Sequence, residues 1–168
     1  VGDKATKAGE KMMPVTAGIT ALGAAGVAAS MELDNGYDTI ITKTGATGEA
    51  LDSLTEVADN VFSDMPTTMD DVGVAVGEVN TRFGATGTEL ENLSKDFIKF
   101  ANINGTDLNT AIDSVDSIMT KFGVDASQTK NVLGLMTKAG QDTGISMETL
   151  ETALTTNGAS LKEMGLDL

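Results

Sequence analysis

The sequence contains no cysteine, no histidine and no tryptophan, and only two of its 168 residues are proline. The absence of cysteine rules out a disulfide framework and thiol chemistry. Without cysteine or histidine, the chain can form neither the usual zinc sites nor the common nucleophile–base pairs of enzymes. We therefore expect a protein that is not an enzyme and that has no metal site and no cofactor.

Aromatic and basic residues are also scarce. Aromatic residues make up 4% of the chain, so a core must be built from Ala, Val, Ile, Leu and nine Met, which favours packed helices over a sheet sandwich. The 11 basic residues stand against 25 acidic ones, and the net charge of −14 lacks the charge pattern of a nucleic-acid binder. The predicted fold class is all-α.

Small residues dominate the uncharged segment 12–31. Ala17, Ala21, Ala25 and Ala29 recur every four positions along one helical ridge, a spacing that lets helices pack closely. The segment is also long enough to span a membrane, although its proline, threonines and glycines make it poorly hydrophobic. A self-packing helix is the preferred interpretation, and a membrane-inserting segment and a disordered one remain open.

Polar residues at 34–36 predict a break after this first helix. A second helix is predicted from Glu49 to about Phe62, with Thr47 as its N-cap and with apolar residues along one stripe. Beyond Pro66, Thr68 precedes Asp71 at the spacing of an acidic capping box, which predicts the start of another helix. We therefore divide the chain into an Ala/Gly-rich N-terminal helix (1–33), a helix with connecting loops (34–66) and a series of helix hairpins (67–168), and we expect it to be a piece of a longer chain.

The hairpin region is periodic. The turn at Phe83-Gly84 is matched at Phe122-Gly123 and at Met164-Gly165, at spacings of about 39 and 42 residues. Between the first two copies the match extends further, for example from Arg82 to Lys121. Each unit is predicted to be a helix that ends at a glycine, a short loop and a capped second helix. Stacked hairpins that repeat every ~40 residues would bury a continuous core, as in helical solenoids.

Specific residues are expected to end or begin these helices. Glycine can adopt the left-handed conformation that closes a helix, and a hydroxyl side chain can cap the next helix. The predicted turn and cap residues are Gly84, Thr88, Gly105, Thr106, Gly123, Ser127, Gly144, Ser146 and Gly165. Thr88 with Glu91 and Ser160 with Glu163 have the spacing of a full capping box.

Three short stretches resemble ligand-binding loops but lack the defining residues of such loops. Residues 102–107 lack the final glutamate of a calcium loop. The glycine-rich stretches 45–48 and 84–87 lack the lysine and hydroxyl residue that end a phosphate loop. We interpret all three as helix connections.

The order of several stretches resembles the conserved N-terminal-side domain of bacteriophage and prophage tail tape measure proteins. The stretches that carry this resemblance are 14–19, 23–26, 31–34, 44–48, 75–84, 138–146 and 158–166. The run Ala75-Val76-Gly77-Glu78-Val79-Asn80-Thr81-Arg82-Phe83-Gly84 is the most similar to the family. Each stretch is a cap or a turn, so it is their order that is typical of the family.

The resemblance implies a structural protein of the virion tail that templates the length of the tail tube and leaves during DNA ejection. It implies assembly in the host cytoplasm, with further copies of itself, the tail-tube protein, the tail-tip initiator and tail assembly chaperones as partners, and with passing DNA that is not specifically bound. The glycine-broken helices predict a compact domain and not the measuring rod itself. A soluble helical-repeat adaptor that binds other proteins is the first alternative, and a membrane-inserting protein that uses residues 12–31 is the second.

Overall fold

The computed structural model describes the backbone of residues 25–165 and the side chains of residues 32–165. This part of the chain contains α-helices, one 3-10 turn and no strand, which confirms the all-α prediction. The elements are α3 (Ala25–Thr44), α4 (Glu49–Asp64), α5 (Met69–Phe83), α6 (Gly87–Asn104), α7 (Leu108–Phe122), η1 (Ala126–Gln128), α8 (Thr129–Thr143) and α9 (Met147–Glu163).

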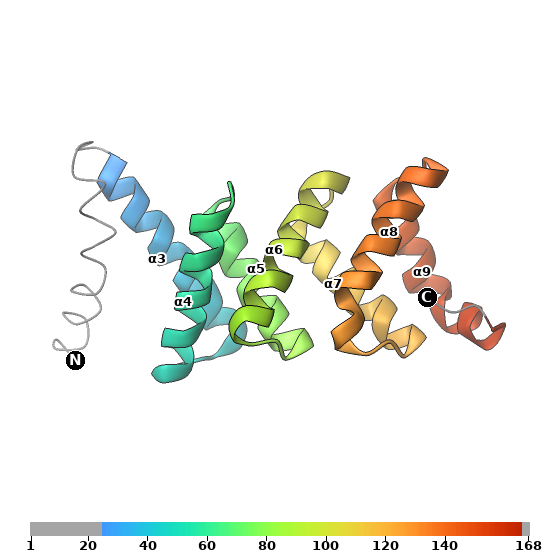
Figure 1. Ribbon diagram of the computed structural model, residues 1–168, viewed down its shortest axis with the longest axis horizontal. Helices are drawn as coiled ribbons and strands as arrows, with labels where there is room; N and C mark the ends of the chain where they lie inside the picture. The colour runs from blue at the N-terminus through green and yellow to red at the C-terminus, as the bar shows by residue number, and fades with distance from the viewer. Residues whose placement is uncertain (1–24, 166–168) are drawn as a thin grey trace.

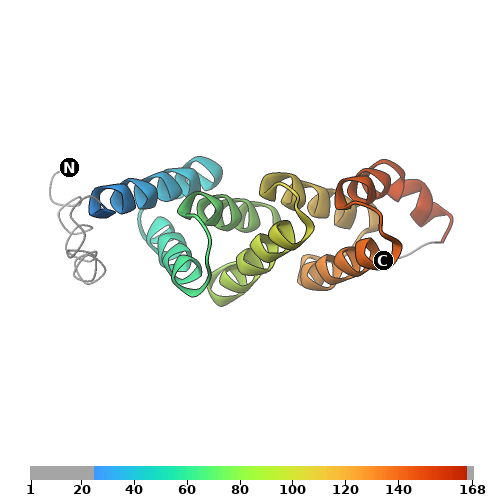
Figure 2. The ribbon, with the colours of Figure 1, turned by 90° about the horizontal axis from the view of Figure 1, so that it is seen from above.

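The helices lie in two rows along an elongated molecule (Figure 1, Figure 2). In the first row α3 packs on α5, α5 on α7, and α7 on α9. In the second row α4 packs on α6, and α6 on α8. Consecutive helices also contact one another across the rows, so each connecting turn carries the chain from one row to the other.

The last three helices of the first row begin at a constant spacing. α5, α7 and α9 start at Met69, Leu108 and Met147, which are 39 residues apart in both steps. We use this spacing to define three units: unit 1 is residues 30–68, unit 2 is 69–107 and unit 3 is 108–146. The turn at Met164-Gly165 follows the turn at Phe122-Gly123 by 42 residues instead of 39, because α9 is longer than α7.

One apolar core runs between the two rows. Its fully buried side chains come from every unit and include Ile40, Val61, Val76, Leu90, Phe97, Ile112, Val115, Ile118 and Met136. Helices of 15 to 20 residues can each bury only one stripe, so neighbours on both sides are needed to cover it. The core therefore depends on stacking and not on any single hairpin.

Side-chain caps fix where the first-row helices begin. The side chains of Thr68, Asp107 and Ser146 accept hydrogen bonds from the backbone N–H groups of the third residue in α5, α7 and α9. Each cap directly precedes a buried apolar residue, at 69, 108 and 147. A cap of this kind satisfies one of the backbone donors that a helix start leaves without a partner.

Glycines close the helices at the expected positions. Gly84, Gly105, Gly123 and Gly144 are left-handed C-caps with φ between 64° and 70°. Gly165 also has a positive φ of 83°, directly after the residue that caps α9. Gly45, at φ 65°, follows α3 in the same way, although no cap was expected there.

Three of the expected hydroxyl caps are wrong. Thr88 lies inside α6, because Gly87 at φ 55° is already the first residue of the helix and Thr86 is its N-cap. Thr106 instead donates its backbone N–H to Ala101 O, 3.1 Å away, and the cap is its neighbour Asp107. Ser127 lies in η1 and donates its backbone N–H to the carboxylate of Asp125, which caps that turn. In the last two cases an aspartate nearer the helix start is the better acceptor.

Three further expectations about helix boundaries also differ. Residues 34–36 lie within α3, because Gly36 is the point where α5 crosses it and does not break the helix. Ser160 and Glu163 lie in the last turns of α9 and start no helix. Thr47 does not cap α4, whose N-cap is Gly48 without a side-chain hydrogen bond. Tertiary packing thus overrides the local preference of these residues.

The uncharged segment 12–31 is only partly covered by the structure. Ala17 and Ala21 lie outside the described residues, and Ala25 and Ala29 lie in the first turns of α3, where side chains are not described. Within residues 25–165 no helix combines the length and the apolar character that crossing a membrane requires. The self-packing and membrane interpretations of this segment stay predictions.

Candidate functional site

Basic residues near the ends of α3, α5 and α7 connect neighbouring helices of the first row. Lys43, Arg82 and Lys121 are 39 residues apart, and each reaches the next helix in the row. We call these three residues the basic ladder. The last turn of a helix is also where a positive charge is favoured by the helix dipole.

The first step of the ladder is centred on Glu78 of α5. Its two carboxylate oxygens accept hydrogen bonds from Lys43 Nζ and from Arg82 Nε, each at 2.6 Å. Burial alone would raise the pKa of Glu78, but the hydrogen bonds and charges of Lys43 and Arg82 outweigh it and lower the pKa below its usual value. The carboxylate therefore stays ionised and joins α3 to α5.

The second and third steps use different acceptors. Arg82 reaches α7, where it pairs with Asp113 and with Asp116, the latter at 3.2 Å. Lys121 donates to Ser117 Oγ at 3.2 Å on its own helix and to the backbone carbonyl of Thr155 on α9. The basic residue of the ladder thus binds a carboxylate at α3–α5 but a neutral backbone carbonyl at α7–α9.

Beside the first step, α3 and α5 cross at glycines. A Cβ atom built on Gly36 would lie 2.5 Å from the backbone oxygen of Met69, and one on Gly73 would lie 2.5 Å from the backbone oxygen of Gly36. A Cβ on Gly77 would lie 2.9 Å from Cβ of Lys43. Any larger residue at Gly36 or Gly73 would force two backbones apart, so this contact requires glycine on both helices.

The corresponding contact between α7 and α9 contains a buried acid. Glu151 of α9 is 3% exposed, and its Oε1 has no hydrogen-bond partner among residues 32–165. Burial raises its pKa to about 7, the nearby Ser114 hydroxyl lowers it, and Glu148 raises it further. Glu151 occupies the position of Gly73 and Ile112 in the 39-residue spacing, so it faces the preceding helix of the row.

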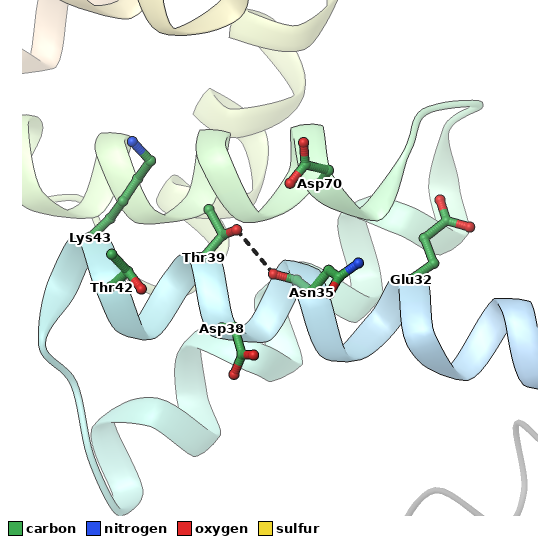
Figure 3. Close-up of a pocket in the computed structure, with 7 residues that line it drawn as sticks. All are labelled: Glu32, Asn35, Asp38, Thr39, Thr42, Lys43 and Asp70. Atoms are coloured by element: carbon green, nitrogen blue, oxygen red, sulfur yellow. Dashed lines mark hydrogen bonds between the residues drawn. The ribbon is translucent and has the colours of Figure 1, made fainter.

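An open groove runs along α3 and the first turn of α5 (Figure 3). It has a volume of about 650 Å³ and is lined by polar residues of α3 with Asp70 of α5. Thr39 Oγ1 donates to the backbone oxygen of Asn35 at 3.0 Å, as the dashed line in Figure 3 shows. Among residues 25–165 no group of acids is arranged to hold a metal ion. The hydrogen bonds and ion pairs of α3 hold neighbouring helices in place.

A repeated tetrapeptide in the sequence marks part of this site. Residues 45–48 and 84–87 have the same sequence, Gly-Ala-Thr-Gly, at a spacing of 39 residues. Extending the register through them would have aligned Lys43 with Arg82 and Lys121. No comparable signal marks Gly36, Gly73 or Glu151, because a helix crossing is set by the tertiary arrangement.

Comparison with known proteins gives one family. The model of a family described as phage-related minor tail protein matches residues 56–168, from the middle of α4 through α9. No curated protein and no solved structure matches the chain. The matched segment covers units 2 and 3 completely.

Proposed function

This chain belongs to the phage-related minor tail protein family, and we propose that it is a folded domain of a tail tape measure protein that templates the length of the tail tube. The family match, which covers the stacked helices from α4 to α9, is the observation that carries this proposal. The role is structural and non-catalytic. The domain would assemble in the host cytoplasm and leave with the parent protein during DNA ejection.

The shape of the stack supports a folded domain and not a ruler. As one continuous helix, the 39 residues of a unit would extend about 58 Å at a rise of 1.5 Å per residue. Folded as a helix pair, a unit advances the stack by one helix-packing distance, roughly 8–10 Å. A segment that measures tail length must extend far along the tube per residue, so we place that segment elsewhere in the parent chain.

The surface charge supports a position beside DNA without binding to it. Unit 1 has eight acidic and one basic residue, a net charge of −7. Such a surface repels the phosphate backbone, which is suited to a tube through which DNA must pass. We propose the tail-tube protein, the tail-tip initiator, tail assembly chaperones and further copies of the chain as partners.

Two in-frame deletions in the parent gene test this proposal. One removes unit 3, residues 108–146, and the matched control removes 39 residues from the extended part of the parent chain. Tail lengths are then measured by electron microscopy. We expect the control deletion to shorten tails by about 58 Å, and the unit 3 deletion either to leave tail length unchanged or to prevent assembly. Tails shortened equally by both deletions would show that the stack itself measures length, and no shortening by either would contradict the tape measure role.

A further inference from the structure

In the second row, the α4–α6 and α6–α8 contacts lie at equivalent places in the 39-residue spacing, but different side chains line them. Between α4 and α6 the space is filled by Lys95, whose side chain is 13% exposed. Its ammonium group pairs with Asp64 at 2.6 Å and with Glu91 at 2.7 Å. This triad joins α4 to α6.

Between α6 and α8 each member of that triad is replaced. At the positions 39 residues later in the chain, Gly134 stands in place of Lys95, Ile103 in place of Asp64, and Lys130 in place of Glu91. Nothing lies within 4 Å of a Cβ built on Gly134, and Ile103 is 67% exposed. The result is a groove of about 480 Å³ with Phe100 and Leu133 in its lining.

Lysines surround this groove. Lys99, Lys130 and Lys138 line it together with the acids Asp96 and Asp142. The side chains of Lys130 and Lys138 are 77% and 70% exposed even though each pairs with one of those acids. Exposed Ile103 therefore lies among three lysines, in a chain whose net charge is −14.

The outer face of α3 carries acidic residues, whereas lysines surround the α6–α8 groove. Asp34, Asp38 and Ile41 follow one another at i, i+4 and i+7, so they share one face of the helix. All three are exposed, and Ile41 at 38% is one of the exposed large apolar residues of the described chain. Figure 3 shows Asp38 directed away from α5. An exposed isoleucine here lies beside acids, whereas Ile103 lies beside lysines.

The net charge becomes less negative from unit 1 to unit 3. Unit 1 has a net charge of −7, unit 2 has seven acidic and three basic residues (−4), and unit 3 has four acidic and three basic residues (−1). The acidic α3 face and the lysine-lined groove thus lie in regions of different charge. Complementary charge of this kind steers association and sets which surfaces meet.

We propose that the α6–α8 groove binds a second copy of this chain through the acidic face of its α3. Ile41 of one copy packs beside Ile103 of the other, and the lysines around the groove face Asp34 and Asp38. The two surfaces differ, so the contact is head-to-tail and can continue from copy to copy. Further copies of the chain are among the partners proposed above, and this contact names the surfaces through which two copies meet. It is tested on the isolated chain, so its failure leaves the length-measuring role untouched.

Two variants of the full 168-residue chain test the contact. An α3 variant carries Asp34→Lys and Asp38→Lys. A closed-groove variant carries Gly134→Lys, Ile103→Asp and Lys130→Glu, which rebuilds the α4–α6 triad at α6–α8. A control with Thr120→Glu and Thr156→Glu, on exposed positions of α7 and α9, changes the net charge by the same −2 as the closed-groove variant. Circular dichroism checks that each variant is folded.

Sedimentation velocity at about 0.05 M and about 0.5 M salt supplies the measurement. The unaltered chain and the control should associate with rising concentration at low salt, and association should weaken about tenfold or more at high salt. Each variant alone should be a monomer, and an equal mixture of the two should form a pair, because the groove of the α3 variant meets the α3 of the closed-groove variant. A monomeric unaltered chain, association that survives groove closure, or a mixture that fails to pair would each overturn the proposal.

Discussion

The first and last contacts of the first row, α3–α5 and α7–α9, occupy the same register but are built from different side chains. At α3–α5, Gly36 and Gly73 bring two backbones together, and Glu78 is held by Lys43 and Arg82. At α7–α9 the equivalent position is Glu151, a buried acid beside Ser114, and the lysine of the ladder reaches only a backbone carbonyl.

Both contacts keep the same helix spacing, although their side chains differ. The helix spacing is kept at both ends, so backbone register does not depend on one type of contact. The α3–α5 contact tolerates no added volume, whereas the α7–α9 contact depends on the protonation of one carboxyl group. We therefore expect the first contact to be sensitive to size and the last to be sensitive to pH.

The largest effect should come from adding one methyl group at the glycine crossing. In Gly73→Ala the new Cβ would meet the backbone oxygen of Gly36 at 2.5 Å, so the helices must separate. We expect a loss of about 3 kcal/mol in the free energy of unfolding, measured by urea denaturation. Gly134→Ala is the matched control, because open space surrounds that position inside α8. The control should be neutral or more stable by about 0.5–1 kcal/mol, and equal losses in both would refute the role of close packing.

The second effect is a pH dependence that comes from Glu151. The pKa of Glu151 is about 7 in the folded state against an ordinary value of 4.5. Between these two values the folded chain retains a proton that the unfolded chain has released, so stability falls as the pH rises through this range. We expect this group to contribute a loss of about 3 kcal/mol.

Glu151→Gln should remove this contribution, because the amide does not ionise. The comparison is urea denaturation of both chains at pH 5 and at pH 8, with Glu163→Gln as a control at an exposed position of the same helix. The advantage of Glu151→Gln should be larger at pH 8. An advantage that is the same at both pH values would mean that Glu151 does not titrate between them.

The third effect should be equal at the two ends of the row. Thr68→Ala and Ser146→Ala each remove a hydrogen bond to the third backbone N–H of a helix, in α5 and in α9. Each should cost about 1 kcal/mol in thermal or chemical unfolding. Thr88→Ala, at an exposed position inside α6, should change stability by less than about 0.5 kcal/mol. Unequal losses at Thr68 and Ser146 would mean that the ends differ in more than their contacts.

The smallest effect concerns the basic ladder. Arg82→Gln removes ion pairs to Glu78, Asp113 and Asp116, but the arginine is 31% exposed and solvent screens these pairs. We expect a loss of about 0.5–1 kcal/mol that shrinks in high salt. Lys121→Gln should cost less, since its acceptors are neutral. A larger loss for Lys121→Gln would reverse the proposed order of the two contacts.

The helical class and most turns could be predicted from the sequence because they depend on local chemistry. The glycines at 84, 105, 123 and 144 end helices where a left-handed residue is needed, which a short window of sequence reveals. The choice between adjacent caps was less predictable. At Thr106 and Asp107 both residues can accept a hydrogen bond, and the position next to buried Leu108 decides which one does.

Features that depend on two distant segments could not be predicted in this way. Gly36 looks like a helix breaker in a polar stretch, and only the approach of α5 explains why it lies inside α3. The burial of Glu151 is equally hidden, since an acid on a helix is normally exposed. The lysine-lined groove is visible only when Lys95 and Gly134 are compared at equivalent places in the stack.

Removal of unit 3 from the chain tests the central claim, that 39-residue helix pairs stack as equivalent units. Deleting residues 108–146 places Met147 directly after the Asp107 cap and lets α9 pack on α5. We expect the shortened chain to keep its helical ellipticity per residue and to unfold in one cooperative urea transition, with a slope reduced in proportion to the buried surface. Loss of helical signal, or a broad transition without cooperativity, would contradict the equivalence of the units.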